Sequence, residues 1–346
     1  MHSTGKQNFD DLDAEGRIGL VLRRGIRWTV VGFASLWAAG AVYVDGPLGM
    51  DDGNIWLAVA WLAVAAACLA LIRIAWKKYL VWLVWFLVVL IPWTAKSPSN
   101  ERPWKPEWAK TGWVEFSDGA LEFHNFRNFD YGADGSVVES WETRTVSIRN
   151  LRGMDYFHDA FGGDLIAHPM LSFDFGADGY VALSVETRRE VDEAYSKLGG
   201  LYKMFELQYL WGDERDFVRV RTNVRDEPVY LYRTSFPREQ ALFVLLDSVR
   251  ETNLLARQPR FYNVISANCT TSLLAQTVEF RNAPFDIRML ANGRFDELIY
   301  ETGGILADGL PFEELRERAL INPVALYAHG DAAFSQRIRA DRVGFD

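Results

Sequence analysis

The residues best suited to chemistry in this sequence gather around one cysteine in its second half. Cys269 lies in the segment YNVISANCTTSLL, at the start of an apolar run that predicts a short helix over 268–278. A thiol at the start of a helix is close to free N–H groups and to the positive end of the helix dipole, and both favour the reactive thiolate. The preceding residue, Asn268, offers an oxygen suited to capping that helix. Cys269 is therefore a candidate nucleophile, and a buried packing residue is the alternative interpretation.

A thiol nucleophile needs a base, normally an imidazole, and a polar group that orients the base. His168 begins the segment HPMLSFDFGADGYVALSVETR, which predicts a β-hairpin with its turn at 176–179. Counting back from the turn places Glu186 or Thr187 opposite His168, and a carboxylate would stabilise the imidazolium. Ser184 is a weaker candidate for this role, and His124, in another predicted strand, is an alternative base. A lone histidine that merely begins a strand is the structural interpretation.

Other motifs of catalysis and binding are missing from the sequence. There is no H-E-x-x-H or C-x-x-C, so we expect no metal site, and no G-x-x-x-x-G-K-[ST] or strand-linked G-x-G-x-x-G, so we expect no nucleotide cofactor. G-x-S-x-G is absent as well, which weakens an α/β-hydrolase interpretation. A net charge of −9 argues against a basic nucleic-acid-binding protein. We expect His158, His329 and the acidic cluster at 213–216 to be structural or solvated.

Three apolar runs without a charged residue occupy 28–44, 55–72 and 79–93. The first two are long enough to span a membrane, and the third reaches that length with residues 94 and 95. Three runs argue against a cleavable signal peptide, and buried helices of a soluble core are the alternative. Basic residues precede the first run and separate the second from the third, whereas the loop between the first two is acidic. The positive-inside rule then predicts a bacterial inner-membrane protein with a cytoplasmic N-terminus and a periplasmic C-terminal part.

The predicted organisation has four parts: a cytoplasmic segment 1–27, a three-helix transmembrane anchor 28–95, a juxtamembrane linker 96–110 and a periplasmic domain 111–346. The linker holds three prolines, and its Trp104 and Trp108 are expected at the membrane interface. Within the domain, β-rich segments are predicted at 114–131 and 136–148, a hairpin at 168–188 and a strand pair at 216–224 and 227–235. Helices are predicted over 190–207, 237–256 and 311–320. No element is assigned after Leu320. The pattern indicates an α+β fold.

Charge and cysteine content differ between the two parts of the chain. Residues 1–95 carry 8 Lys and Arg against 7 Asp and Glu, and residues 96–346 carry 29 against 39. The exported domain is therefore acidic. Cys68 lies inside the second apolar run, so Cys269 has no partner for an intramolecular disulfide.

Several segments together resemble the Lnb N-terminal periplasmic domain family. They are HNFRNFDY at 124–131, HPMLSF at 168–173, SVETR at 184–188, FELQY at 205–209, DERD at 213–216 and YN through NCTT at 262–271. The resemblance covers about residues 110–285. That family is similar to the papain-like NlpC superfamily in circularly permuted form, in which the histidine strand precedes the cysteine helix. The order of His168 and Cys269 agrees with the permuted arrangement, so the resemblance implies a permuted papain-like (NlpC-like) domain.

The resemblance also implies an activity, lipoprotein N-acylation, in which an acyl chain passes from a phospholipid to the α-amine of a lipoprotein's lipidated N-terminal cysteine. Cys269 would attack the ester carbonyl and hold the acyl group as a thioester, His168 would transfer the proton, and Glu186 would orient His168. The backbone N–H of Cys269 would stabilise the oxyanion, with Asn268 and Tyr262 as further donors. The implied partners are the phospholipid bilayer and lipoproteins.

One departure from the family leaves the substrate open. The namesake enzymes carry this domain ahead of their membrane part, whereas here the three spans come first. The same cysteine and histidine would serve a lipid hydrolase or an NlpC-like peptidoglycan amidase or endopeptidase. A non-catalytic envelope scaffold is the third interpretation, because a fold alone does not determine function.

Overall fold

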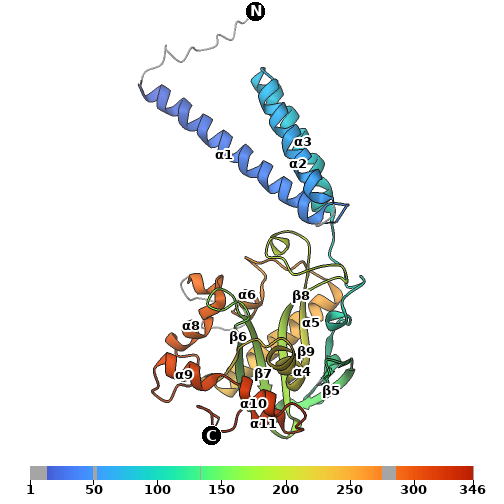
Figure 1. The fold of residues 1–346 in the computed structure, drawn as a ribbon, viewed down its shortest axis with the longest axis vertical. Helices are drawn as coiled ribbons and strands as arrows, with labels where there is room; N and C mark the ends of the chain where they lie inside the picture. Colours follow the sequence, from blue (N-terminus) through green and yellow to red (C-terminus); the bar gives the residue numbers. More distant parts are fainter. Residues whose placement is uncertain (1–13, 50–52, 133, 275–285, 346) are drawn as a thin grey trace, which may run out of the picture. The chain divides into compact units, whose positions relative to one another are not determined.

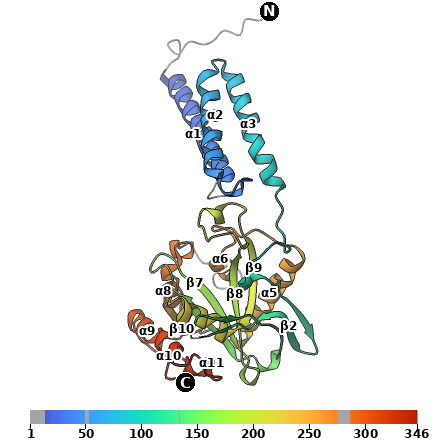
Figure 2. The same ribbon diagram turned by 45° about the vertical axis from the view of Figure 1, so that its right-hand side comes forward.

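Three long helices form the N-terminal unit of the chain, which ends at Ser97. In the computed structural model, which describes residues 14–49, 53–132, 134–274 and 286–345, α1 spans Ala14–Asp45, α2 spans Asn54–Leu71 and α3 spans Ala75–Ala95 (Figures 1 and 2). All three are long and apolar enough to cross a membrane by length and composition. The prediction of three apolar N-terminal helices is confirmed.

Small residues and a few polar contacts hold these helices together. Ala38, Ala58 and Ala65 are buried between them, where short side chains allow close approach. Trp82 Nε1 of α3 donates a hydrogen bond to Ser35 Oγ of α1 at 2.9 Å. At the end of α1, Asp45 accepts a hydrogen bond from Trp93 Nε1 at 2.8 Å, so this acidic residue is satisfied within the helix bundle.

The second unit, which begins at Pro98, is built on an eight-stranded sheet. Its strands are β1 Trp113–Ser117, β2 Ala120–Arg127, β5 Trp141–Ser147, β6 Gly153–Asp159, β7 His168–Asp174, β8 Tyr180–Arg188, β9 Glu206–Asp213 and β10 Val229–Arg233. The order is β1-β2-β9-β8-β7-β6-β10, and β5 pairs with β2. The β2–β9 pair is parallel and the others are antiparallel. Two short strands, β3 Asp130–Tyr131 and β4 Val137–Val138, pair separately.

Helices cover both faces of this sheet. They are α4 Glu214–Arg219, which continues into a π-helical turn η6 Val220–Val224, α5 Arg238–Arg257, α6 Cys269–Leu274, α8 Phe295–Glu301, α9 Phe312–Ala319, α10 Asn322–Tyr327 and α11 Phe334–Arg337. Short helical turns are η2 Pro106–Trp108, η3 Ile148–Asn150, η4 Gly176–Asp178, η5 Gly199–Leu201, η7 Ile287–Met289 and η8 Asn292–Arg294. The mixed sheet with its helices confirms the α+β class.

The β7–β8 hairpin fixes which residues share a face of the sheet. Its turn contains η4 and lies at the predicted place, with Gly176 and Gly179 at φ of 58° and 85°, a region that favours glycine. Met170 of β7 pairs with Ser184 of β8. Because side chains alternate along a strand, His168 and Glu186 project to the same face as Met170. Met170 lies in the main core cluster beneath α4, α10 and α11, so these polar residues occupy the end of that core face.

The predicted strand over 216–224 is wrong, because these residues form α4 and η6. The alternation of apolar and charged residues imitates a half-buried strand, but both arginines within it are buried in ion pairs. Arg219 contacts Asp130 at 2.6 Å, and Arg221 contacts Asp159 at 3.1 Å. The second strand of the predicted pair is confirmed as β10.

The predicted helix over 190–207 is also wrong. Gly199 and Gly200 form only the short turn η5, and β9 begins at Glu206. The helices predicted over 237–256 and 311–320 are confirmed as α5 and α9. After Leu320, the helices α10 and α11 complete the core.

The tryptophans of segment 96–110 do not lie free at a membrane interface, and that expectation is wrong. Trp104 and Trp108 are only 8 % and 3 % exposed within the second unit. The guanidinium of Arg188 lies 4.3 Å from the Trp104 ring centroid, and that of Arg189 lies 4.3 Å from the Trp108 centroid. These cation–π contacts pack the segment onto the end of β8.

Candidate active site

A chain of hydrogen bonds crosses the β7–β8 hairpin from the ring of His168. His168 Nε2 lies 2.6 Å from Ser184 Oγ, and Ser184 Oγ donates to Glu186 Oε1 at 2.6 Å. The same carboxylate oxygen lies 3.4 Å from His168 Nε2. The strand register therefore brings all three side chains together, with Ser184 between the histidine and the carboxylate.

The charges of His168 and Glu186 stabilise each other. Burial lowers the pKa of His168, but the charge of Glu186 and hydrogen bonds to Cys269 and Glu186 outweigh burial and raise this pKa to about 9. Burial raises the pKa of Glu186, but the charges of His168 and Arg221 bring it well below its ordinary value. At neutral pH the ring is therefore an imidazolium beside an ionised carboxylate, and both of its nitrogens are donors.

Cys269 is the first residue of α6, which packs against β7 and β8. The predicted helix start is therefore confirmed, and residues 275–278 of the predicted helix lie outside the described residues. His168 Nε2 is engaged by Ser184 and Glu186, so Nδ1 is the ring nitrogen left for the thiol. The capping residue Asn268 accepts a hydrogen bond from Thr271 N at 2.7 Å and donates one to the Val264 carbonyl at 2.6 Å. The side-chain amide of Asn268 therefore uses these two hydrogen bonds to hold the turn before Cys269.

Arg221 is a site residue that the sequence reasoning missed. It projects from η6, and its Nη2 lies 3.1 Å from Glu186 Oε1 while its Nε lies 3.1 Å from Asp159 Oδ2. In the β6–β7 register, Asp159 pairs with His168. Arg221 therefore contacts the same Glu186 oxygen that accepts the hydrogen bond of Ser184. The strand predicted over 216–224 gave no reason to place Arg221 here.

Asn292 is a second missed residue, and it connects the histidine and cysteine segments. Its Oδ1 accepts a hydrogen bond from Ala167 N at 2.9 Å, and its Nδ2 donates to the Ala167 carbonyl at 2.7 Å and to Thr270 Oγ1 at 2.7 Å. Ala167 precedes His168 and Thr270 follows Cys269. The side chain is only 7 % exposed, so one buried amide holds the two segments in register. Because Asn292 is distant in sequence from both, no local pattern marks it.

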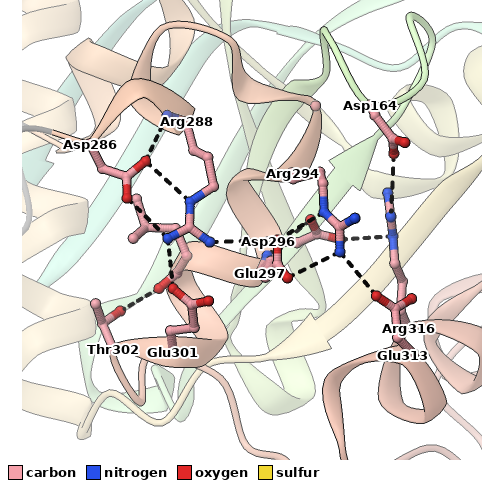
Figure 3. A network of polar contacts seen from close by, with 12 residues as sticks. Asp164, Asp286, Arg288, Arg294, Asp296, Glu297, Glu301, Thr302, Glu313 and Arg316 are labelled. Atoms are coloured by element: carbon pink, nitrogen blue, oxygen red, sulfur yellow. Dashed lines mark hydrogen bonds and ion pairs between the residues drawn. The ribbon is translucent and has the colours of Figure 1, made fainter.

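A network of ion pairs includes Arg294, which lies in η8 with Asn292 (Figure 3). Arg294 pairs with Glu297 at 2.8 Å and with Glu313 of α9 at 2.9 Å. Arg316 of α9 lies 3.2 Å from the fully buried Asp296. These contacts tie η8, α8 and α9 together, so Asn292 projects from a braced segment.

Cys269, His168 and Glu186 line one cavity of about 890 Å³, a size typical of ligand-binding sites. Six large apolar side chains of the same cavity are each at least 40 % exposed: Phe161, Leu165, Leu198, Leu201, Ile265 and Leu290. Apolar groups gathered in this way mark a site for an apolar ligand or partner. We call these six residues the apolar rim.

Tyr262 also lines the cavity and is 5 % exposed. Burial raises its pKa, and the neighbouring Cys269 raises it further, so its hydroxyl keeps its proton. A neutral hydroxyl beside the thiol can donate a hydrogen bond to an oxyanion. Among the described residues, no group of three His, Cys, Asp or Glu side chains is placed to hold a metal ion.

Comparison with known protein families identifies the region that contains this site. Residues 138–293 match the family model described as the Lnb N-terminal periplasmic domain. This region is an Lnb N-terminal periplasmic domain. The family predicted from the sequence is therefore confirmed, and no curated protein or solved structure gives a significant match. With its three helices able to cross a membrane, the chain is a membrane protein with a periplasmic domain of the Lnb type.

The matched Lnb region runs from β4 to η8 and contains both the hydrogen-bonded hairpin and α6. His124 lies outside this region and does not line the cavity; it contacts Glu122 at 3.3 Å and stacks on Trp113. His158 is buried and lies 3.0 Å from the Gly293 carbonyl, and His329 lies 2.6 Å from the Tyr131 carbonyl. His168 lines the cavity, whereas His124, His158 and His329 do not.

The acidic cluster at 213–216 has structural contacts. Asp213 accepts a hydrogen bond from Arg215 N at the start of α4. Asp216 is fully buried and pairs with Arg127 at 2.9 Å. Glu214 pairs with Arg339 at 2.6 Å. The carboxylates of this cluster therefore hold α4 against the sheet.

Proposed function

We propose that this protein is a membrane-anchored cysteine-dependent acyltransferase acting on lipid or lipoprotein acyl groups at the periplasmic face of the inner membrane. One observation carries the proposal: Cys269 and a carboxylate-supported His168 line a cavity that also carries the apolar rim. A thiol–imidazole pair supplies the nucleophile and the acid–base group for acyl transfer. An apolar rim suits an acyl chain better than a peptide. The basic loops of the membrane helices favour a cytoplasmic N-terminus.

The proposed first step forms a thioester. The Cys269 thiolate attacks the carbonyl carbon of an acyl ester, and the negative charge that develops on the carbonyl oxygen is stabilised by the Cys269 N–H and the Tyr262 hydroxyl. The bond from carbon to the alkoxy oxygen breaks, and the His168 imidazolium donates its proton to the departing alcohol. Glu186 and Ser184 hold the ring by its other nitrogen.

The proposed second step transfers the acyl group to an amine. The now neutral imidazole takes a proton as the amine nitrogen attacks the thioester, a carbon–nitrogen bond forms and the carbon–sulfur bond breaks. Cys269 leaves as the thiolate and His168 is again an imidazolium, so the site returns to its starting state. Water in place of the amine would make the same site a hydrolase.

Full-length protein and its Cys269→Ala and His168→Ala variants test the proposal. We expect the wild-type chain to transfer acyl groups to a lipoprotein acceptor in detergent or vesicles, as measured by mass spectrometry. His168→Ala should lose at least about 100-fold in rate because its acid–base group is removed, and Cys269→Ala should form no product because no thioester can form. Wild-type product levels in both variants would exclude the proposed pair. Cleavage of purified muropeptides without lipid would favour a peptidoglycan amidase instead.

A further inference from the structure

Three basic side chains line the cavity around Cys269 without a close ion-pair partner among the described residues. They are Arg189, Lys197 and Arg225. The Arg189 guanidinium has no hydrogen bond or ion pair in the described part of the chain, and its Nε is buried. Arg225 Nη1 lies 4.0 Å from Glu227 Oε2, at the outer limit of an ion pair. The cavity therefore contains unpaired positive charge.

The other charged groups of the cavity do not cancel this charge. The lining holds five basic residues, His168, Arg189, Lys197, Arg221 and Arg225, and three acidic residues, Asp159, Glu186 and Glu227. Asp159 and Glu186 are engaged by Arg221 and His168. Burial and the charge of Asp159 raise the pKa of Glu227 to about 7, so Glu227 only partly balances Arg225 at neutral pH.

A positive cavity stands out in this domain, because residues 96–346 carry 39 acidic against 29 basic residues. If the cavity had the average composition of this domain, its lining would carry a net negative charge. The local excess of positive charge is therefore built by the particular residues that line the cavity.

The Arg189 guanidinium is held in place before any ligand arrives. It stacks 4.3 Å above the ring of Trp108, which is itself buried. Burial, with the nearby charge of Arg225, lowers the pKa of Arg189 by more than the carboxylates of Glu186, Glu107 and Glu193 raise it, so its charged form is less favourable here than in water. An anion beside the two guanidinium groups would remove that cost. The planar fork of arginine matches the oxygens of phosphate.

We propose that Arg189, together with Arg225, binds the phosphate group of an acyl-bearing phosphate ester while the apolar rim takes its acyl chains. The inference rests on the proposed acyltransferase function, because it assigns the residues that hold the phosphate of the acyl donor in that cavity. Its ligand chemistry is that of a phospholipid headgroup, and a soluble phosphate would offer the same anion without an acyl chain. Lys197, which is exposed, adds positive charge at the cavity.

Binding to the full chain with the Cys269→Ala substitution tests this assignment without any turnover. The ligands are dioctanoyl-phosphatidylglycerol, dioctanoylglycerol with the same chains, and inorganic phosphate, each titrated calorimetrically into detergent-solubilised protein. We expect the phospholipid to bind at least about tenfold more tightly than the neutral lipid, and Arg189→Gln to abolish that difference. Arg149→Gln, which changes an exposed arginine outside the cavity, is the matched control and should keep it.

The possible results separate the sources of the phosphate. Equal binding of the two lipids, or a preference that survives in Arg189→Gln, would overturn the proposal. Inorganic phosphate that binds as tightly as the phospholipid, and loses its binding in Arg189→Gln, would support the phosphate site but overturn its assignment to a lipid. Because Cys269 is absent, failure of acyl transfer by the wild-type chain would not affect this result.

A turnover ratio completes the test in the active protein. Acyl transfer from dioctanoyl-phosphatidylglycerol is compared with transfer from p-nitrophenyl octanoate, which carries no phosphate. We expect Arg189→Gln to lower the ratio of the two kcat/KM values at least about tenfold. A ratio equal to that of the wild-type chain would contradict phosphate recognition by Arg189.

Discussion

Replacing Glu186 by Gln removes the charge that keeps His168 protonated. The raised pKa of His168, about 9 against an ordinary 6.5, corresponds to about 3 kcal/mol in favour of the imidazolium. Burial and the charge of Arg221, which lower this pKa, remain in the variant, and so does the hydrogen bond to Cys269, which raises it. We therefore expect the ring of Glu186→Gln to titrate well below 9.

Two measurements check this shift. NMR of ¹³C-labelled histidine, with the His168 signal assigned from His168→Ala, follows the ring directly. The alkaline limb of the pH profile of kcat/KM should fall with the same midpoint, because the imidazolium donates the proton to the departing alcohol. Glu239→Gln, at an exposed position on α5, is the matched control and should titrate like the wild-type chain. A midpoint that stays near 9 in Glu186→Gln would refute the role of Glu186.

The same pair makes stability depend on pH with a definite sign. Because the pKa of His168 is raised, its contribution is complete below about 6.5 and is lost as the pH rises through about 9. Because the pKa of Glu186 is lowered, its contribution is complete above 4.5 and is lost as the pH falls below that value. The Tm of the wild-type chain should therefore exceed that of Glu186→Gln most between pH 4.5 and 6.5. A difference that grows toward pH 9 would contradict this sign.

Three further substitutions test how the site and core are held. Asn292→Ala removes the buried amide that joins the histidine and cysteine segments. We expect kcat to fall at least about tenfold while phospholipid binding is retained. A kcat equal to that of the wild-type chain would contradict the positioning role of Asn292. Gly293→Ala places a Cβ 2.2 Å from the backbone of Asp164, so thermal unfolding should show a clear drop in Tm. Arg339→Gln removes the shared partner of the buried Asp155, which keeps Arg233, and of the buried Glu214, and should cost about 3 kcal/mol, whereas Arg337→Gln at an exposed ion pair should change Tm little.

Much of the fold could be predicted from the sequence because the decisive signals are local. Charge-free apolar runs indicate α1, α2 and α3, and the 176–179 turn between two β-rich runs indicates the β7–β8 hairpin. The hairpin register then places Glu186 near His168 by counting residues from the turn. The start of α6 at Cys269 follows from the apolar run that begins there.

The remaining parts depend on contacts between residues distant in sequence. The alternation around Arg219 and Arg221 is typical of a strand, but buried partners on other elements stabilise a helix there instead. The sequence predicts Trp104 and Trp108 at the membrane interface, but the arginines at the end of β8 stack on their rings. Asn292 carries no local signal, because its three partners lie in two other segments.

The measurement that tests the central claim most directly is the mass of Cys269 during turnover. Full-length protein is mixed with an acyl-lipid donor in the absence of acceptor, quenched with acid, digested and analysed by mass spectrometry. The proposed mechanism predicts one acyl group on the peptide that contains Cys269, released by hydroxylamine as a thioester should be, and no such adduct in Cys269→Ala. Acyl transfer by Cys269→Ala at the wild-type rate, with no adduct on the wild-type peptide, would contradict it.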